Sequence, residues 1–177
     1  MTIQIGRVQS RLELKQILSL QKENIPNALS IKEMEQEGFL TVTHTLNLLD
    51  RMNKVCSHII AKENGKVIGY ALCMHPKFGN EIDVLKPMFE EINSVLSPGE
   101  KYMVMGQVCI HKEYRKMGIF QNLYKKMQVV IRTNYNCIIT EVDALNKRSL
   151  KAHFAVGFIE LKTYNSNGRK WHLLVLK

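Results

Sequence analysis

The sequence lacks most of the features that mark a membrane, secreted or metal-binding protein. None of its apolar runs approaches the ~20 residues needed to cross a bilayer, and its first residues show no basic segment followed by an apolar one, as a secretion signal would. Its four cysteines lie far apart and form no Cys-x-x-Cys pair. We therefore expect a cytoplasmic protein with reduced, mostly buried thiols and without a metal ion or a disulfide.

Internal repeats, low-complexity segments and linkers rich in Pro, Gly or Ser are also missing. The 177 residues are 45% hydrophobic and 23% charged, values that are typical of a folded globular protein rather than a disordered one. A chain of this length can bury a substantial core. The sequence therefore predicts one domain that spans residues 1–177.

The net charge is the unusual feature of the composition. It is +9 at neutral pH, and a basic protein attracts anions such as nucleic acid, acidic lipid or a polyphosphate. The sequence has no basic tail and no basic run interleaved with aromatic residues, as single-strand binders have. The densest group of basic residues is Lys112, Arg115, Lys116, Lys125 and Lys126. A phosphate-bearing cofactor explains this group more economically than nucleic acid, which remains an alternative motivated by charge alone.

Hydrophobic periodicity predicts a mixed α/β fold. Two strand-like runs, 58–62 and 66–74, flank Asn64-Gly65, a dipeptide that suits a type I′ hairpin turn. The other expected strands are 2–7, 101–110, 137–142, 158–164 and 171–176, and the last two are joined by the turn 165–168. The expected helices lie near 14–21, 46–52, 82–96, 119–131 and 149–156. A further short helix is expected to begin at the capping box 30–33. This order predicts a central mixed sheet of six to seven strands flanked by four to five helices, with a βαβ crossover in the second half.

The segment 106–124 carries the strongest chemical signal. A buried strand leaves through a basic turn and enters an amphipathic helix, with Gly118 at the start of that helix. Free backbone N–H groups and the positive end of the helix dipole attract an anion there, and glycine lets the backbone approach it closely. Arg115 and Lys116 add positive charge. The turn therefore suits a pyrophosphate, although many turns of this kind are purely structural.

This segment resembles motif A of the GNAT acetyltransferases. In that family a strand ending Val-x-Val is followed by Tyr-Arg-x-x-Gly-Ile and then a small residue. The matching residues here are Val108-Cys109-Ile110 and then Tyr114-Arg115-Lys116-Met117-Gly118-Ile119-Phe120. Phe120 departs from the pattern, which implies a different helix start or a more enclosed phosphate pocket.

A second block resembles the family segment Asn-x-x-Ala/Ser-x-x-x-Tyr-x-x-x-Gly-Phe. Asn146, Ser149, Gly157 and Phe158 are in register with it, while His153 stands at the tyrosine position. Together with the hairpin, the resemblance covers roughly residues 58–176. It implies a GNAT fold, acetyl-CoA as acyl donor, a primary amine as acceptor, and a monomer or homodimer; the absence of a long apolar run adds the expectation of no membrane partner.

The resemblance also implies roles for individual residues. Backbone groups of Val108, Cys109 and Ile110 would hold the pantetheine arm and the acetyl carbonyl. Amides from Arg115 to Phe120, including those of Lys116, Met117, Gly118 and Ile119, would bind the pyrophosphate. Asn146 and Ser149 would line the far side of the pantetheine.

Two side chains are candidates for the chemistry, because the amine must be neutral to attack and the leaving thiolate needs a proton. Glu141, in the pair Glu141-Val142, resembles the base of ribosomal-protein N-terminal acetyltransferases. His153 is the candidate acid, since imidazole exchanges protons near neutral pH. The structural alternatives are a salt-bridged strand glutamate and a packing histidine, and many relatives use a water chain instead of one base. An acyl-enzyme route through Cys109 is less favoured, because a buried thiol is usually inert.

Other functions stay open at this level. A longer acyl chain or an alcohol acceptor is possible, and so is a degenerate GNAT-fold module that binds CoA or regulates without transferring an acyl group. Phe120 and the missing tyrosine favour that last alternative. The acceptor side, roughly residues 20–55 and 160–172, contains no diagnostic residue, although Lys162, Arg169 and Lys170 hint at an acidic acceptor.

Overall fold

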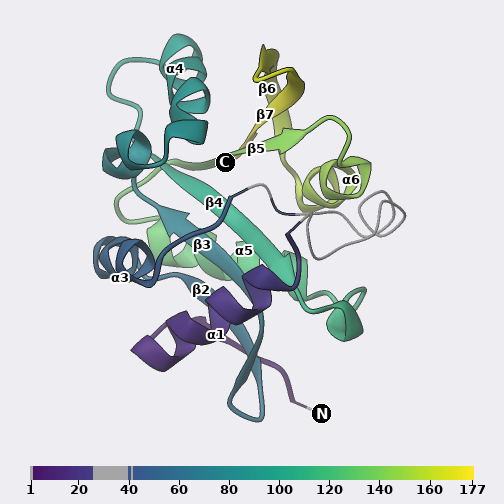
Figure 1. Ribbon diagram of the computed structural model, residues 1–177. Helices are drawn as coiled ribbons and strands as arrows, with labels where there is room; N and C mark the ends of the chain where they lie inside the picture. Colours follow the sequence, from purple (N-terminus) through teal and green to yellow (C-terminus); the bar gives the residue numbers. More distant parts are fainter. Residues whose placement is uncertain (1, 26–39, 41) are drawn as a thin grey trace.

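The computed structural model describes residues 2–25, 40 and 42–177, so the capping box expected at 30–33 lies outside the described residues. Within them, seven strands form one sheet in the order β1-β2-β3-β4-β5-β7-β6 (Figure 1). The strands are β1 (Gln4–Arg7), β2 (Ile59–Glu63), β3 (Lys66–Met74), β4 (Tyr102–Ile110), β5 (Cys137–Asp143), β6 (Ile159–Ser166) and β7 (Arg169–Leu176). The described α-helices are α1 (Arg11–Lys22), α3 (Leu46–Val55), α4 (Lys86–Val95), α5 (Ile119–Ile131) and α6 (Lys147–Val156).

All neighbouring strands run antiparallel except β4 and β5, which are parallel and joined through α5. This confirms the predicted mixed sheet and the βαβ crossover in the second half. No helix in the described part of the chain is both long and apolar enough to span a membrane.

Turn chemistry fixes both hairpins of the sheet. Asn64 and Gly65 have φ of 48° and 78°, which confirms the type I′ turn between β2 and β3. Asn167 and Gly168 repeat this geometry between β6 and β7 with φ of 51° and 71°. The second turn is therefore two residues long, shorter than the 165–168 turn that the sequence predicts, because the strand ladder extends to Ser166 and Arg169.

Two helix starts differ from the expected ones for local reasons. The helix expected from residue 82 begins at Lys86 with Pro87 in its first turn, and two 3₁₀ helices (Pro76–Glu81 and Asp83–Leu85) precede it. Proline suits a first helical turn because its missing N–H would have no partner there. The helix expected from residue 149 begins at Lys147, because the Asn146 side chain caps it.

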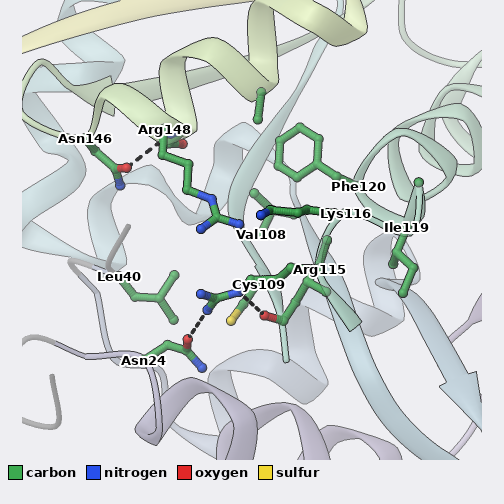
Figure 2. A pocket seen from close by; sticks show the side chains of 14 residues that line it. Asn24, Leu40, Val108, Cys109, Arg115, Lys116, Ile119, Phe120, Asn146 and Arg148 are labelled. Carbon is green, nitrogen blue, oxygen red and sulfur yellow. Dashed lines mark hydrogen bonds between the residues drawn. The ribbon is translucent and has the colours of Figure 1, made fainter. Parts of the chain in front are cut away.

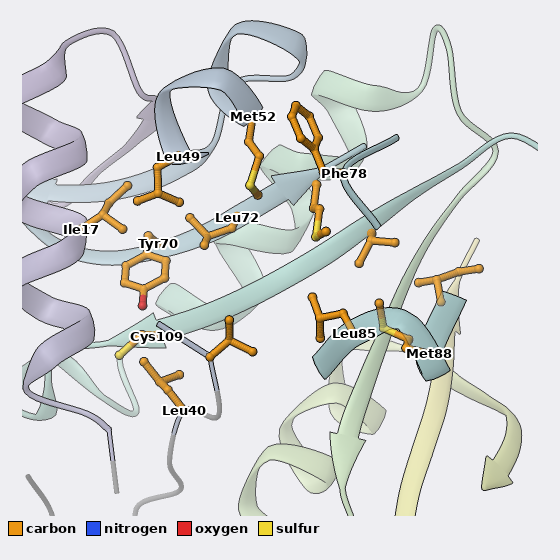
Figure 3. Close-up of a cluster of buried hydrophobic side chains, with 14 of the residues drawn as sticks. Ile17, Leu40, Leu49, Met52, Tyr70, Leu72, Phe78, Leu85, Met88 and Cys109 are labelled. Atoms are coloured by element: carbon orange, nitrogen blue, oxygen red, sulfur yellow. The ribbon is translucent and has the colours of Figure 1, made fainter. Parts of the chain in front are cut away.

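The sheet separates two layers of helices and two hydrophobic cores. Helices α1 and α3 lie in front of the sheet in Figure 1 and α5 lies behind it. Figure 3 shows the front core, where Ile17 of α1 and Leu49 and Met52 of α3 point toward Tyr70 and Leu72 of β3. Both cores are filled by buried side chains, and the cavities described below lie where the sheet itself opens.

The sheet opens between β4 and β5. Their pairing ends at Val104 and Ile139, although β4 continues to Ile110 and β5 to Asp143. A β-bulge in β4 turns the strand away: Cys73 pairs with Met105 and Ala71 with Val108, so two residues of β4 face one of β3. Beyond the last pair, the Thr140 hydroxyl donates to the Met105 carbonyl over 3.0 Å. A side chain thus satisfies a backbone group that the separated strands leave unpaired.

Candidate active site

A cavity of about 250 Å³ lies between the end of β4 and the starts of α5 and α6 (Figure 2). Its walls contain all of the cofactor residues predicted from the sequence except Met117, whose side chain is 49% exposed and lines none of the cavities described here. The predicted residues that line it are Val108, Cys109, Ile110, Arg115, Lys116, Gly118, Ile119, Phe120, Asn146 and Ser149. The fold therefore brings the two sequence blocks together.

The turn before α5 has the backbone that an anion site needs. Gly118 is the N-cap of α5 in the left-handed region, with φ of 74°, and Lys116 has φ of 66°. A Cβ at Gly118 would meet nothing within 4 Å, so backbone conformation rather than space requires the glycine. No side chain of the described residues caps the helix. Its first N–H groups and its dipole are thus available to an anion at the cavity wall.

Three cations line this cavity: Arg115, Lys116 and Arg148. Figure 2 shows their charged ends converging on one hollow from the turn and from α6. Arg115 is also anchored, because it donates from Nε to the Ile110 carbonyl (3.0 Å) and from Nη2 to Asn24 Oδ1 (2.9 Å). Since no Asp or Glu is among the described residues of its wall, the cavity is positively charged and suits a polyphosphate.

The opposite wall of this cavity is the start of α6. Asn146 Oδ1 accepts from the Ser149 backbone N–H over 3.2 Å, which is the usual geometry of a helix N-cap. The two residues that the family resemblance pairs are therefore one capping unit, and this unit fixes the start of α6 beside the cavity.

The two departures from the family pattern meet in space. The Phe120 and His153 rings pack edge to face with centroids 5.1 Å apart, and the Tyr124 ring contacts both. His153 is only 1% exposed. Its Nδ1 lies 2.7 Å from the Ser149 carbonyl, which can only accept, so Nδ1 carries the proton and Nε2 accepts from the Tyr124 hydroxyl at 2.7 Å. Burial lowers the pKa of His153 to about 4, which keeps the ring neutral.

Two smaller cavities, of about 80 and 40 Å³, extend the site between β4 and β5. Leu40, Val108, Asn146 and Ser149 border both the first and the second cavity. The second and third share Met105, Gly106, Thr140, Glu141 and Trp171. Because neighbouring cavities share these residues, the three cavities lie in a row, and we call this row the groove. It runs from the basic turn, past the bulge in β4, to β5 and β7.

Glu141 lies at the far end of the groove. Its carboxylate accepts from the hydroxyl of Tyr164 on β6, across the intervening strand β7. Burial raises the pKa of Glu141 to about 7, with the Tyr164 hydrogen bond lowering it and the charge of Asp143 raising it. Asp143 itself accepts from Arg169 (2.8 Å) and from the Leu145 backbone N–H (2.9 Å). Because the pKa of Glu141 is about 7, its carboxyl group is partly protonated and partly ionised at neutral pH.

Cys109 lies in the wall of the first cavity, but its thiol is not prepared for nucleophilic chemistry. Burial raises the pKa of Cys109 to about 12, with the positive charge of Arg115 acting in the opposite direction. A thiol with such a pKa is almost entirely protonated at neutral pH, and only the thiolate is a good nucleophile. This geometry does not favour an acyl-enzyme route.

Sequence reasoning missed several residues of the groove. Arg148 lies within the second sequence block, and its positive charge near the start of a helix could have marked it as a residue of the anion site. Leu85 and Met88 line the third cavity, and Trp171 lines both the second and the third. Tyr164 donates a hydrogen bond to Glu141. Leu85 and Met88 follow a helical stripe that reads only as core, so no sequence signal separates them from ordinary packing residues.

The family assignment agrees with this geometry. The sequence profile of the Acetyltransferase (GNAT) family matches residues 14–158, and the chain belongs to that family. A comparison with curated proteins gives no match.

Solved structures share the fold over nearly the whole chain. Ard1 from Thermoplasma volcanium is 13% identical with a TM-score of 0.68, and the match covers 99% of this chain and 97% of that one. Salmonella typhimurium yncA, a putative acetyltransferase solved with its cofactor acetyl-CoA, is 13% identical with a TM-score of 0.66 over 100% and 94%. Arabidopsis thaliana Naa50, in complex with the bisubstrate analogue CoA-Ac-MVNAL, is 14% identical with a TM-score of 0.66 over 100% and 99%. At these identities the likeness shows the fold alone.

Proposed function

We propose that this chain, acting as one domain, transfers the acetyl group of acetyl-CoA to a primary amine by direct attack. The position of Glu141 carries the proposal: a carboxyl with a pKa of about 7 lies at one end of a groove whose other end is a basic turn. Membership of the GNAT family and the acetyl-CoA and CoA analogue in two structural neighbours support the same donor.

The residues present fit a donor that carries a pyrophosphate. Backbone amides of the turn from Arg115 to Phe120 would hold the phosphates, supported by the charges of Lys116 and Arg148. Val108, Cys109 and Ile110 would hold the pantetheine arm and the acetyl carbonyl, with Asn146 and Ser149 on the other side. The bound donor supplies an activated thioester carbon, and the bond between this carbon and sulfur breaks as the bond to the amine nitrogen forms.

Glu141 would act as the base. An amine bound beside it arrives mostly as ammonium and cannot attack until one proton leaves. The ionised carboxylate accepts that proton, and its pKa of about 7 lies near the ~7.7–8.0 of an α-amine, so the transfer costs little. The second proton of the amine leaves after attack, and the departing thiolate takes up one proton.

The contacts of His153 favour a structural role over the expected acid role. The ring is neutral at working pH, and both of its nitrogens already have partners within the helical layer. We propose that His153 positions Tyr124 and Phe120 and so shapes the wall of the donor cavity.

The alternative is a module that binds CoA without catalysing transfer. It is favoured by the replacement of the family's small residue and tyrosine by Phe120 and His153. These rings pack against each other, however, and the cavity beside them keeps a volume of about 250 Å³. Both alternatives predict donor binding, and only transferase activity separates them.

Calorimetric titration of acetyl-CoA, CoA and ATP into the protein, followed by an assay of amine-dependent CoA release, tests the proposal. We expect saturable binding of acetyl-CoA, tighter than that of ATP, and release of CoA when an amine is added. Binding without release under any amine would leave the CoA-binding module. Absence of binding would mean that the turn before α5 is only structural.

A further inference from the structure

The two ends of the groove carry opposite charge. Arg115, Lys116 and Arg148 line the first cavity without any described carboxylate. Glu141 lines both of the other cavities and Asp143 lines the second, and among the described residues of those walls there is no Lys or Arg. A donor rich in phosphate suits the first end, and the second end is where the acceptor amine has to lie in the proposed reaction.

None of the three basic residues that suggest an acidic acceptor in the sequence lines the groove, and two of them are engaged in ion pairs. Lys162 pairs with Glu91 on α4 and lies 3.4 Å from the Ser94 hydroxyl. Arg169 pairs with Asp143 at 2.8 Å. Lys170 lines none of the three cavities described above. The basic residues that hint at an acidic acceptor in the sequence therefore offer no counterion for a carboxylate inside the groove.

The hydrophobic side chains of the acceptor end gather in the third cavity, where Thr140 is the polar neighbour of Glu141, while the second cavity is lined mostly by polar residues. Six hydrophobic side chains surround Glu141 in the third cavity, and all of them except Trp171 are buried in the structure. They are Val42, Leu85, Met88, Val104, Met105 and Trp171. A charged group placed against them would lose its hydration without gaining a partner, which is costly.

We propose that the acceptor is a primary amine carried on an uncharged, apolar group, with no carboxylate beside the amine. This inference rests on the proposed acetyl transfer and names the acceptor class of the same site. A carboxylate bonded to the carbon that bears the amine would lie within a few ångströms of Glu141, in a partly desolvated site where like charges repel strongly. An ammonium on an alkyl or amide-bearing carbon is attracted by the Glu141 carboxylate, and its uncharged group can lie against the hydrophobic side chains of the third cavity.

The pKa of Glu141, raised by burial to about 7, points to the same acceptors. The α-amine of an amide or peptide has a pKa of ~7.7–8.0, against ~10.4 for an alkylamine such as the lysine side chain. Glu141 therefore deprotonates the first kind more readily. Among apolar amines, we expect one beside an uncharged carbonyl to react fastest.

A set of amines with the same isobutyl group tests the proposal. Acetylation at pH 8 is measured for leucine, 3-methylbutylamine and leucinamide, which carry a carboxylate, a hydrogen and a carboxamide beside the amine. We expect kcat/KM for 3-methylbutylamine to exceed that for leucine at least about thirtyfold, or about 2 kcal/mol. Basicity alone gives the opposite order, because the amine of leucine is less basic. Leucinamide should be the best of the three.

Two further acceptors extend the set. Glutamic acid α-amide has the amine environment of leucinamide but a charged side chain, and we expect at least about a tenfold lower kcat/KM, or about 1.4 kcal/mol. A leucine-initiated dipeptide amide distinguishes the sources of such an amine: a rate above that of leucinamide assigns a peptide N-terminus, and a lower rate assigns a small molecule.

Binding measurements test whether Glu141 causes the preference for 3-methylbutylamine over leucine. Leucine and 3-methylbutylamine are titrated into the CoA-bound protein, in the wild type and in Glu141→Gln. The preference for 3-methylbutylamine should shrink to within about threefold in the variant, or about 0.7 kcal/mol, because the repelling charge is gone. Equal acetylation of leucine and 3-methylbutylamine would overturn the inference while leaving acetyl transfer intact. Acetyl-CoA binding without acetylation of any amine would instead overturn the proposed function.

Discussion

The donor end and the acceptor end of the groove are built in different ways. The donor end uses mainly backbone groups and side chains from two continuous segments, Val108 to Phe120 and Asn146 to Ala152, to which Asn24 and Leu40 add from the first part of the chain. The acceptor end uses side chains from the stretch before α3, from the start of α4 and from three strands of the sheet. A site made of backbone constrains a short local sequence, whereas a site made of distant side chains can change one residue at a time. The proposed donor site is therefore visible in the sequence, whereas the proposed acceptor site becomes visible only in the assembled groove.

The largest effect should come from the acceptor end. We expect Glu141→Gln to lower kcat about 100- to 10,000-fold, because it removes the proposed base while keeping the shape of the side chain. Acetyl-CoA affinity should stay unchanged, since Glu141 does not line the donor cavity. Glu160→Gln, on the edge strand β6 of the same sheet, is the matched control and should leave kcat unchanged. A similar loss in both variants would point to damage of the sheet rather than to a base.

The pH dependence sharpens this prediction. Only ionised Glu141 accepts a proton, so kcat/KM of the wild type should rise as pH passes through about 7. The folded pKa lies above the ordinary 4.5, so protonated Glu141 favours folding; this contribution is complete below about pH 4.5 and is lost as pH rises through about 7. Glu141→Gln should therefore melt above the wild type at pH 8 but not at pH 4.5. A pH-independent difference in melting would contradict the buried, titrating carboxyl.

A smaller effect is expected from breaking the donor end. Gly118→Asp places a negative charge where the pyrophosphate would lie, and we expect acetyl-CoA affinity to fall at least about tenfold, or about 1.4 kcal/mol. Gly118→Asn has the same size and shares the backbone strain at φ of 74°, which both residues tolerate better than most. It is the matched control and should retain most of the affinity. Calorimetry that finds equal affinities in the two variants would place the anion elsewhere.

The smallest effect on catalysis should come from the buried pair of Tyr124 and His153, although His153 also borders the second cavity. His153→Phe and Tyr124→Phe each remove one side of the same buried hydrogen bond. We expect each to lower the free energy of unfolding by about 1–3 kcal/mol, because the remaining partner is left unsatisfied. Turnover of the folded protein should change less than about tenfold in both. If His153→Phe alone lost turnover about 100-fold at unchanged donor affinity, His153 would be the acid after all.

Local signals predicted much of the fold because each depends on neighbours in the chain. Asn64-Gly65 and Asn167-Gly168 adopt the positive φ that their hairpins require, and Gly118 begins α5 as the motif implies. The signals were weaker at helix starts, where a cap or a proline decides the boundary. Pro87 shortened α4, and the Asn146 cap lengthened α6 by two residues relative to the expected start. Met117 lies within the motif yet outside the cavity, because a motif does not state which side chains face inward.

The sequence by itself determined the family, the mixed sheet and the basic turn that begins α5, since strand alternation, turn residues and a helix N-terminus act over a few neighbouring residues. Only the tertiary structure decided which charges remain available and which groups are buried. It paired Lys162 with Glu91 and Arg169 with Asp143, and it enclosed His153 among aromatic rings. It also raised the pKa of Glu141, because burial and distant partners set a proton affinity. The spacing of residues along the chain specifies neither the partner of a charged side chain nor the burial of a titratable group.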